Sequence, residues 1–320
     1  MASSKFKIPV ICGPTACGKT ALGIKLAETC GGEIVSMDSR QIYKGMDIGT
    51  AKPTLEELSR AKHHMLDVAE PGDRFTVVDY ARGARATIKS IIERGKTPII
   101  VGGTFLYLSA LAGKLEFCGS DEDPEYRAQL TEEAEKYGVE ALHARLRAAD
   151  PVAAEKIHPN DVFRVARALE ALKSSGKRPS EMRAKRVAQV PRDSDDPWEF
   201  IVFMLEAPRK ILYDIINKRT AIMYNNGLVE EAGAIASLGT RERLFLEKTI
   251  GYSEALKVID GQRDIEWSVE ETAKRTRWYA KRQLTWLRAV QGAVSLDAFG
   301  SGADDPLNVV CGIWKAANKD

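Results

Sequence analysis

The sequence predicts an α/β protein in which a parallel sheet flanked by helices is interrupted by an all-helical insertion. Two observations lead to this prediction. Short apolar runs of strand length alternate with helical segments in the first third of the chain, whereas the middle is helical throughout and is followed by another strand. Strands separated by helices pair in parallel, because a parallel connection needs a crossover of a dozen or more residues.

Hydrophobic patterning defines the elements of the first third. Residues 8–12 form an apolar run of strand length, and residues 20–29 carry apolar side chains at helical spacing. Further strands are expected at residues 33–37 and 97–101, with a long helix at 76–93 between them. This order predicts a layered α/β core.

The pattern changes from about residue 119. Residues 123–180 are helical with no strand-like run, and residues 199–205 are again rich in β-branched and aromatic side chains. A helical block between two α/β stretches is typical of an inserted domain. We therefore expect a discontinuous core of residues 1–118 and 199–320, and a helical insertion at 119–198.

Bulk composition is that of an ordinary globular protein. Hydrophobic residues make up 44% of the chain and charged residues 29%, and 47 Lys and Arg against 45 Asp and Glu leave a net charge of +2. This total indicates neither a nucleic-acid nor a membrane partner by itself. Residues 97–113 are apolar, but Pro98 and the Gly102-Gly103 pair interrupt them, so we expect a buried strand, a turn and a helix, and no membrane association.

The five cysteines form neither a C-x-x-C pair nor a zinc-binding spacing. The N-terminal residues also do not resemble a signal peptide. Both observations favour reduced thiols and a cytoplasmic location.

A phosphate-binding motif follows the first expected strand. Residues 13–20 read G-x-x-x-x-G-K-T between a strand and a helix, so their N–H groups and the helix dipole face a bound phosphate. Lys19 adds a positive charge, and the Thr20 hydroxyl is a candidate Mg²⁺ ligand. The core is therefore expected to be P-loop NTPase-like, with a phosphate site formed by Gly13, Pro14, Thr15, Ala16, Cys17, Gly18, Lys19 and Thr20.

The motif identifies a phosphate chain but not the reaction. An ATPase would carry an Asp after an apolar strand to hold Mg²⁺, whereas the strand at 97–101 leads into Gly-Gly and Thr104. The acid is instead Asp38, after the strand at 33–37. Because ligands bind at the carboxyl ends of parallel strands, we expect Asp38 and Thr104 to face the P-loop. The alternative for Asp38 is an Asx turn or a helix cap.

Several segments resemble the tRNA dimethylallyltransferases. They are the P-loop, D-S-R-Q-I-Y at 38–43, G-M-D-I-G-T-A-K-P at 45–53, V-G-G-T at 101–104, I-H-P-N-D at 157–161 with Arg164 and Arg167, and K-R-Q-L-T-W at 281–286. The P-loop is generic, but the second and third segments are specific to this family. The resemblance spans roughly residues 9–288, and the lack of a zinc-finger spacing favours the bacterial type.

The resemblance implies transfer of a dimethylallyl group from dimethylallyl diphosphate to the N6 amine of the adenosine 3′-adjacent to the anticodon in tRNA, with release of diphosphate. The P-loop then holds the diphosphate and Mg²⁺ rather than a nucleotide. Asp38 matches the general base of the family, with Asp47 as the fallback carboxylate. Thr104 matches a threonine at the reacting centre, and Arg219 an arginine that clamps the diphosphate.

Two basic stretches indicate an RNA-binding surface. Residues 164–192 contain nine basic and two acidic residues, and residues 274–288 contain six basic residues, no acid and three aromatics. Cations beside aromatic rings bind phosphates and stack bases, although a single such patch is more often a solvated helix face. With the resemblance, the expected tRNA-binding residues are Asp38, Ser39, Arg40, Gln41, Thr104, Arg127, Arg164, Arg167, Lys281, Arg282, Gln283, Trp286 and Arg288.

Other readings remain at this point. An adenylate dimethylallyltransferase acting on free AMP needs neither the helical insertion nor the basic helix, and a P-loop kinase or ATPase lacks its acid after Val101. A pure RNA-binding protein leaves Asp38 and Thr104 unexplained. The expected partners are the tRNA anticodon stem-loop and dimethylallyl diphosphate, with the chain a monomer. Cys17 stands where the family usually has Ser, and its thiol beside the phosphate site is expected to be open to alkylation.

Overall fold

The computed structural model describes residues 5–113, 123–181, 196–300 and 302–318. These belong to two compact units, residues 1–112 with 195–320 and residues 113–194. The expected core, residues 1–118 with 199–320, differs from the first unit by a few residues at each boundary.

The first unit is built on a six-stranded sheet in which every neighbouring pair is parallel. Its strand order is β3-β2-β4-β1-β5-β6. The strands are β1 (Phe6–Cys12), β2 (Glu33–Ser36), β3 (His63–His64), β4 (Pro98–Gly102), β5 (Trp198–Glu206) and β6 (Val294–Asp297). The predicted parallel α/β sheet is thereby confirmed. The short edge strands β3 and β6 were not predicted, because β3 has only two residues and the four residues of β6, V-S-L-D, form no continuous apolar run.

Strand β5 follows the second unit in sequence and lies in the sheet between β1 and the edge strand β6. It pairs with β1 along its length, from Phe6 opposite Trp198 to Cys12 opposite Met204. Strands from before and after the insertion therefore pair directly in one sheet.

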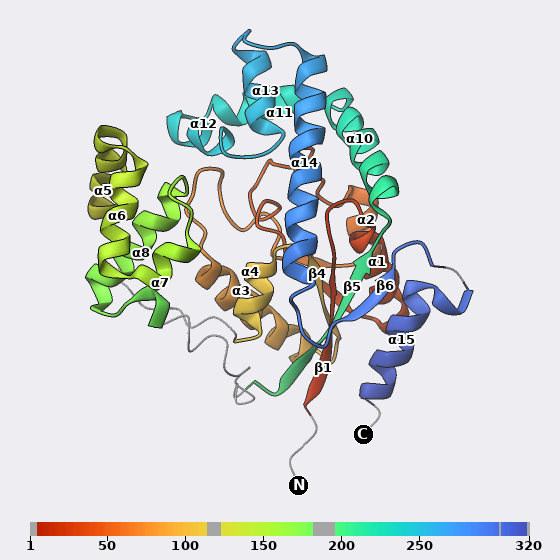
Figure 1. Cartoon of the computed structure of the whole chain (residues 1–320). Helices are drawn as coiled ribbons and strands as arrows, with labels where there is room; N and C mark the ends of the chain where they lie inside the picture. Colours follow the sequence, from red (N-terminus) through yellow and green to blue (C-terminus); the bar gives the residue numbers. More distant parts are fainter. Residues whose placement is uncertain (1–4, 114–122, 182–195, 301, 319–320) are drawn as a thin grey trace. The chain divides into compact units, whose positions relative to one another are not determined.

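Helices cover both faces of the sheet (Figure 1). One core cluster joins the strands to α3 (Val77–Glu93) and α4 (Phe105–Leu111), and the other joins them to α1 (Lys19–Cys30), α10 (Arg209–Asn225) and α15 (Pro306–Ala317). Alternate strand residues supply the two clusters, as the pleat requires: Val10 packs toward α3, and Ile11 toward α1. A short helix, α2 (Leu55–Arg60), begins at a Thr54 capping box.

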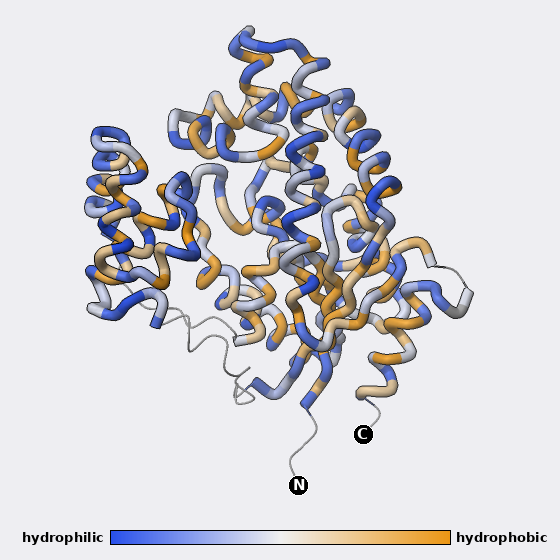
Figure 2. The backbone as a smooth tube through the Cα atoms, in the orientation of Figure 1, coloured by the Kyte–Doolittle hydropathy of each residue, from blue (hydrophilic) through white to orange (hydrophobic). Residues whose placement is uncertain are grey.

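A third cluster in this unit consists of helices and one loop. It joins α11 (Leu228–Ala236), α12 (Thr240–Leu246) and α13 (Tyr252–Ile259) to α10 and to the loop after β2. The long helix α14 (Ile265–Leu287) runs from these helices down to the sheet (Figure 1), where Ala280 and Leu287 enter the two sheet clusters. Figure 2 shows hydrophobic residues concentrated along the strands and mixed with hydrophilic residues along α14.

The second unit contains four described helices with a core of their own. They are α5 (Pro124–Tyr137), α6 (Val139–Ala149), α7 (Pro151–Lys156) and α8 (Val162–Ser175). Asp123, Asp150 and Asp161 cap α5, α7 and α8 by accepting backbone N–H bonds, which satisfies donors that a helix start leaves open. Among the described residues of the whole chain, no helix is both long and apolar enough to cross a membrane.

Candidate active site

The P-loop connects the end of β1 to the start of α1. Gly18 caps α1 with φ 85°, a left-handed conformation that favours glycine. The Lys19 ammonium donates to the carbonyl of Pro14 over 2.6 Å. The loop thus curls over the N-terminus of α1, where N–H groups and the helix dipole favour an anion.

Thr15 is held from two directions. Its N–H donates to Oε1 of Gln283 over 2.8 Å, and its hydroxyl accepts from Nη2 of Arg219 over 2.6 Å. Gln283 comes from α14 and Arg219 from α10. Residues distant in sequence therefore fix the phosphate loop.

Asp38 follows β2 and makes an Asx turn. Its Oδ1 accepts from the N–H groups of Arg40 at 2.8 Å and Gln41 at 3.3 Å. Asp38 thus forms the Asx turn that was the alternative interpretation of this residue. It also lines the cleft described below, as predicted. The turn fixes the carboxylate at the carboxyl end of the sheet.

Thr104 ties the β4 loop to the β2 loop. Its hydroxyl accepts from the N–H of Ser39 at 3.1 Å, and its own N–H donates to the carbonyl of Met37 at 3.2 Å. A Cβ on Gly102 would lie 2.1 Å from the Met37 carbonyl oxygen, so the close approach of these loops requires glycine there. The structure thereby brings Thr104 beside the Asp38 segment.

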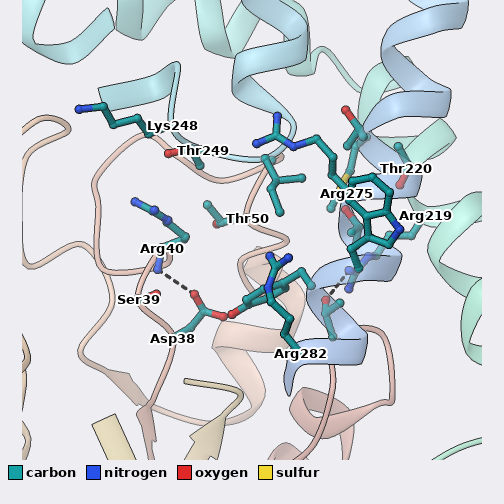
Figure 3. A pocket seen from close by; sticks show the side chains of 18 residues that line it. Asp38, Ser39, Arg40, Thr50, Arg219, Thr220, Lys248, Thr249, Arg275 and Arg282 are labelled. Carbon is teal, nitrogen blue, oxygen red and sulfur yellow. Dashed lines mark hydrogen bonds between the residues drawn. The ribbon is translucent and has the colours of Figure 1, made fainter. Parts of the chain in front are cut away.

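A cleft of about 410 Å³ opens over these residues (Figure 3). Within the described chain, Asp38 is the only acidic residue among those that line it. The cationic lining residues are Arg40, Arg219, Lys248, Arg275 and Arg282. The remaining lining residues are Thr15, Ser39, Gly49, Thr50, Thr220, Met223, Thr249, Ile250, Thr272, Thr276, Trp278 and Tyr279. An excess of positive charge around one carboxylate suits an anionic substrate that meets a base.

Burial shifts the pKa values of two groups in the cleft. It lowers the pKa of the Arg219 guanidinium, and the charge of Asp38 acts in the opposite direction. It raises the pKa of the Tyr279 phenol, as does Asp38, whereas a hydrogen bond with Thr104 lowers it. Tyr279 therefore remains a neutral hydroxyl at physiological pH.

The predicted residues of α14 divide into two groups. Lys281, Arg282 and Trp286 are exposed, as is Arg288 just after the helix. The Trp286 ring is 52% exposed and stacks on Phe105 with centroids 5.6 Å apart. Gln283, expected at the tRNA, is instead buried, and its Nε2 donates to the Gly103 carbonyl at 3.0 Å.

The second unit uses two of its predicted RNA-binding arginines internally. Arg127 and Arg167 both pair with the buried carboxylate of Glu170, at 2.8 and 2.6 Å. Burial raises the pKa of Glu170, but the bonds from the two arginines outweigh it and leave the pKa lowered. Arg164 is exposed and lies 3.2 Å from Asp161. The basic residues Arg183, Lys185, Arg186 and Arg192 lie outside the described residues.

Gln41 and Asp47 belong to the same loop network. Nε2 of Gln41 donates to the carbonyls of Thr50 and Ala51 at 3.2 and 3.0 Å, so this side chain, also expected at the tRNA, supports the neighbouring loop. The Asp47 side chain is 63% exposed, pairs with Lys52 at 2.7 Å and does not line the cleft. This arrangement favours Asp38 over Asp47 as the base.

Thr20 stands in the first turn of α1, partly buried. No group of three or more His, Cys, Asp or Glu suited to a metal occurs in the described parts of the chain. The Thr20 hydroxyl nevertheless suits Mg²⁺, because this ion is often held by one or two protein oxygens while substrate phosphates and water complete its coordination.

Cys17 departs from the expectation of an alkylation-sensitive thiol. Its side chain is only 3% exposed, packed in the cluster with Ile11 and Leu205. A reagent would therefore reach it only when the P-loop opens.

Several lining residues were missed by the sequence reasoning. Lys248, Thr249 and Ile250 come from the turn before α13, and Thr50 from the loop that Gln41 supports. Lys248, Thr249 and Ile250 belong to no local pattern that indicates a site, whereas Thr50 lies within the family-specific segment 45–53 but was not predicted as a site residue. Arg275 and Tyr279 belong to the basic stretch 274–288, but the sequence does not show that these two side chains of the stretch line the cleft.

The fold and the site define a P-loop α/β protein whose phosphate loop, one carboxylate and several cations share a cleft. The chain matches the family described as IPP transferase over residues 41–290. It is 42% identical to the tRNA dimethylallyltransferase of Geobacter sulfurreducens over 90% of each chain, and 45% identical to that of Geobacillus thermodenitrificans over 88% of this chain and 87% of the relative. The chain belongs to this family of IPP transferases.

Solved structures agree with this assignment. The full-length tRNA isopentenylpyrophosphate transferase from Bacillus halodurans matches with a TM-score of 0.70 and 36% identity over 98% of this chain and 99% of that one. A eukaryotic dimethylallyltransferase described as acting on tRNA matches with a TM-score of 0.74 and 29% identity, over 92% of this chain and 74% of that one. The resemblance found in the sequence is therefore confirmed.

Proposed function

We propose that this chain transfers a dimethylallyl group from dimethylallyl diphosphate to the N6 amine of the adenosine 3′-adjacent to the anticodon in tRNA. In this reaction the bond from carbon to the diphosphate oxygen breaks, a bond from N6 to that carbon forms, and N6 loses a proton. The observation that carries the proposal is the shared cleft, in which Asp38 and the Arg219–Thr15 pair stand together.

The diphosphate end is supported by the P-loop. In this proposal its N–H groups, Lys19 and Arg219 stabilise the negative charge that gathers on the leaving diphosphate; Lys19 bonds the Pro14 carbonyl of the loop, and Arg219 bonds Thr15. The planar guanidinium of Arg219 suits a bidentate contact with phosphate oxygens. Thr20 would hold Mg²⁺ together with the diphosphate, and the metal supplies further charge neutralisation there.

Asp38 is the proposed general base. The adenine amine is a poor nucleophile, because its lone pair is delocalised into the ring. Removing its proton as the new bond forms contributes about 10²–10⁴-fold. The Arg40 and Gln41 N–H groups hold Oδ1 of Asp38 in place, which reserves the other oxygen for the substrate.

The RNA end is supported by exposed cations and rings. Arg282, Trp278 and Tyr279 line the cleft from α14, and Trp286 is exposed one turn further along. Such groups bind single-stranded loops by phosphate contacts and base stacking, and a base that reacts must leave its stack. We expect the chain to act as a monomer. A tRNA substrate is consistent with the cytoplasm.

The test is substrate choice. Purified protein is mixed with dimethylallyl diphosphate, Mg²⁺ and either an unmodified anticodon stem-loop or AMP, and nucleoside masses are followed. The proposal predicts a dimethylallyl mass gain on the stem-loop alone. Gain on AMP would identify a free-nucleotide enzyme. ATP hydrolysis without any prenyl transfer would indicate that the P-loop binds a nucleotide rather than dimethylallyl diphosphate.

A further inference from the structure

The loop of residues 45–53 forms one wall of the cleft through Gly49 and Thr50. Its carbonyl side is held by Gln41, and the buried ammonium of Lys52 bonds the Tyr43 carbonyl at 2.6 Å. The opposite, N–H side of the loop faces α11. The contacts on that N–H side therefore determine how rigidly the loop is held beside the cleft.

One carboxylate on α11 meets three successive amides of this loop. Oε2 of Glu231 accepts from the N–H groups of Asp47 at 3.0 Å and Ile48 at 2.8 Å, and Oε1 accepts from Gly49 at 3.1 Å. Consecutive N–H groups that converge in this way form an anion-binding concavity. In this case the anion is a side chain of the protein itself.

Tyr252 on α13 completes the arrangement. Its hydroxyl donates to Oε1 of Glu231 at 2.5 Å, and its ring lies directly under the loop. A Cβ on Gly49 would come within 2.4 Å of that ring and 2.8 Å of Leu228. The loop is therefore pressed onto α11 and α13 at a position where only glycine fits.

We propose that Glu231 is a positioning residue: by holding the backbone of residues 47–49 it fixes Gly49 and Thr50 in the wall of the cleft for reception of the RNA base. The inference rests on the proposed function and deepens it. Glu231 does not line the cleft and acts only through the backbone of the loop. The diphosphate end is anchored separately, by α10 and α14. Loss of the clamp therefore weakens RNA use while leaving dimethylallyl diphosphate binding intact.

The test variant is Glu231→Gln. The amide keeps the size of the side chain and one acceptor oxygen, but its NH₂ group meets N–H donors where a carboxylate oxygen stood. Hydrogen bonds to a charged acceptor are among the stronger ones. We expect the KM for an anticodon stem-loop to rise about tenfold or more, the KM for dimethylallyl diphosphate to stay within about twofold of wild type, and the stem-loop dissociation constant to rise in parallel.

Amide hydrogen exchange separates positioning from a folding defect. In Glu231→Gln we expect faster exchange in residues 44–52 and unchanged exchange in the P-loop. Tyr252→Phe leaves the three amide bonds in place and should give a smaller effect in the same direction. The matched control is Glu230→Gln, on the exposed side of the same helix, which should behave as wild type.

Two results overturn the inference. One is a folded Glu231→Gln protein whose loop exchanges as in wild type. The other is a loosened loop with an unchanged KM for the stem-loop. A wild-type protein that prenylates no RNA would instead refute the proposed function, and the exchange measurement would still report whether Glu231 holds the loop.

Discussion

Arg219 of α10 donates a hydrogen bond to the hydroxyl of Thr15 in the P-loop over 2.6 Å, although 204 residues separate them. The bond places a partly buried guanidinium at the phosphate end of a cleft that also contains Asp38. A glycine-rich loop thereby gains a fixed cation beyond its own lysine.

Arg219→Lys should lower the rate of transfer at least about tenfold, because an ammonium cannot reproduce the bidentate contact of a guanidinium with diphosphate. Thr15→Ser is the matched control, since it keeps the hydroxyl that Arg219 contacts. Steady-state kinetics with varied dimethylallyl diphosphate and saturating stem-loop measure the effect. Wild-type kinetics in Arg219→Lys would show that Arg219 does not contact the diphosphate.

Asp38→Asn should lower the single-turnover rate of transfer by about 10²–10⁴-fold, because an amide cannot take the N6 proton. The dissociation constant for the stem-loop should change little, since the side chain keeps its size. Asp47→Asn is the control, because that carboxylate is exposed and lies outside the cleft lining. A large rate loss in Asp47→Asn with a small one in Asp38→Asn would reverse the assignment of the base.

Gln283→Leu should raise the KM for dimethylallyl diphosphate and leave stem-loop affinity within about twofold of wild type. The substitution leaves the Thr15 N–H and the Gly103 carbonyl without a buried partner, and each such group costs about 1–3 kcal/mol. Trp286→Ala provides the contrast: its exposed ring should matter for RNA and not for the isoprenoid. Loss of stem-loop affinity in Gln283→Leu would instead show that Gln283 contributes to RNA binding.

Glu33 should make stability pH-dependent in acid. Burial raises its pKa, but bonds from Lys96 and His64 and the charge of Arg94 bring it down to about 2 from the ordinary 4.5. The depressed pKa stabilises the fold fully above pH 4.5, and this contribution disappears as pH falls toward 2.

Urea unfolding at several pH values tests this prediction. The difference in unfolding free energy between wild type and Glu33→Gln should shrink by roughly 3 kcal/mol from pH 5 to pH 2. Glu93→Gln removes an exposed partner of Lys89 and should show no such trend. A constant difference for Glu33→Gln would mean that its native pKa is not depressed.

The sequence was sufficient to predict the fold class and the proximity of Asp38 and Thr104 at one edge of the sheet. Strand–helix alternation implies a parallel sheet, and residues after adjacent parallel strands must meet at one edge. The sequence did not predict the register of the strands or the geometry with which the helices cross the sheet. Helical spacing places Arg282 and Gln283 next to each other, but it does not reveal that one faces the cleft and the other enters the core. Likewise, no local pattern identifies Glu231 as the acceptor for a loop more than a hundred residues away.

The position of the added group in RNA tests the central claim most directly. Unmodified tRNA is treated with the protein, dimethylallyl diphosphate and Mg²⁺, then digested and mapped by tandem mass spectrometry. We expect one dimethylallyl group, on N6 of the adenosine 3′-adjacent to the anticodon, and its loss with Asp38→Asn. A group on another nucleotide, or none in a protein that hydrolyses ATP, would contradict it.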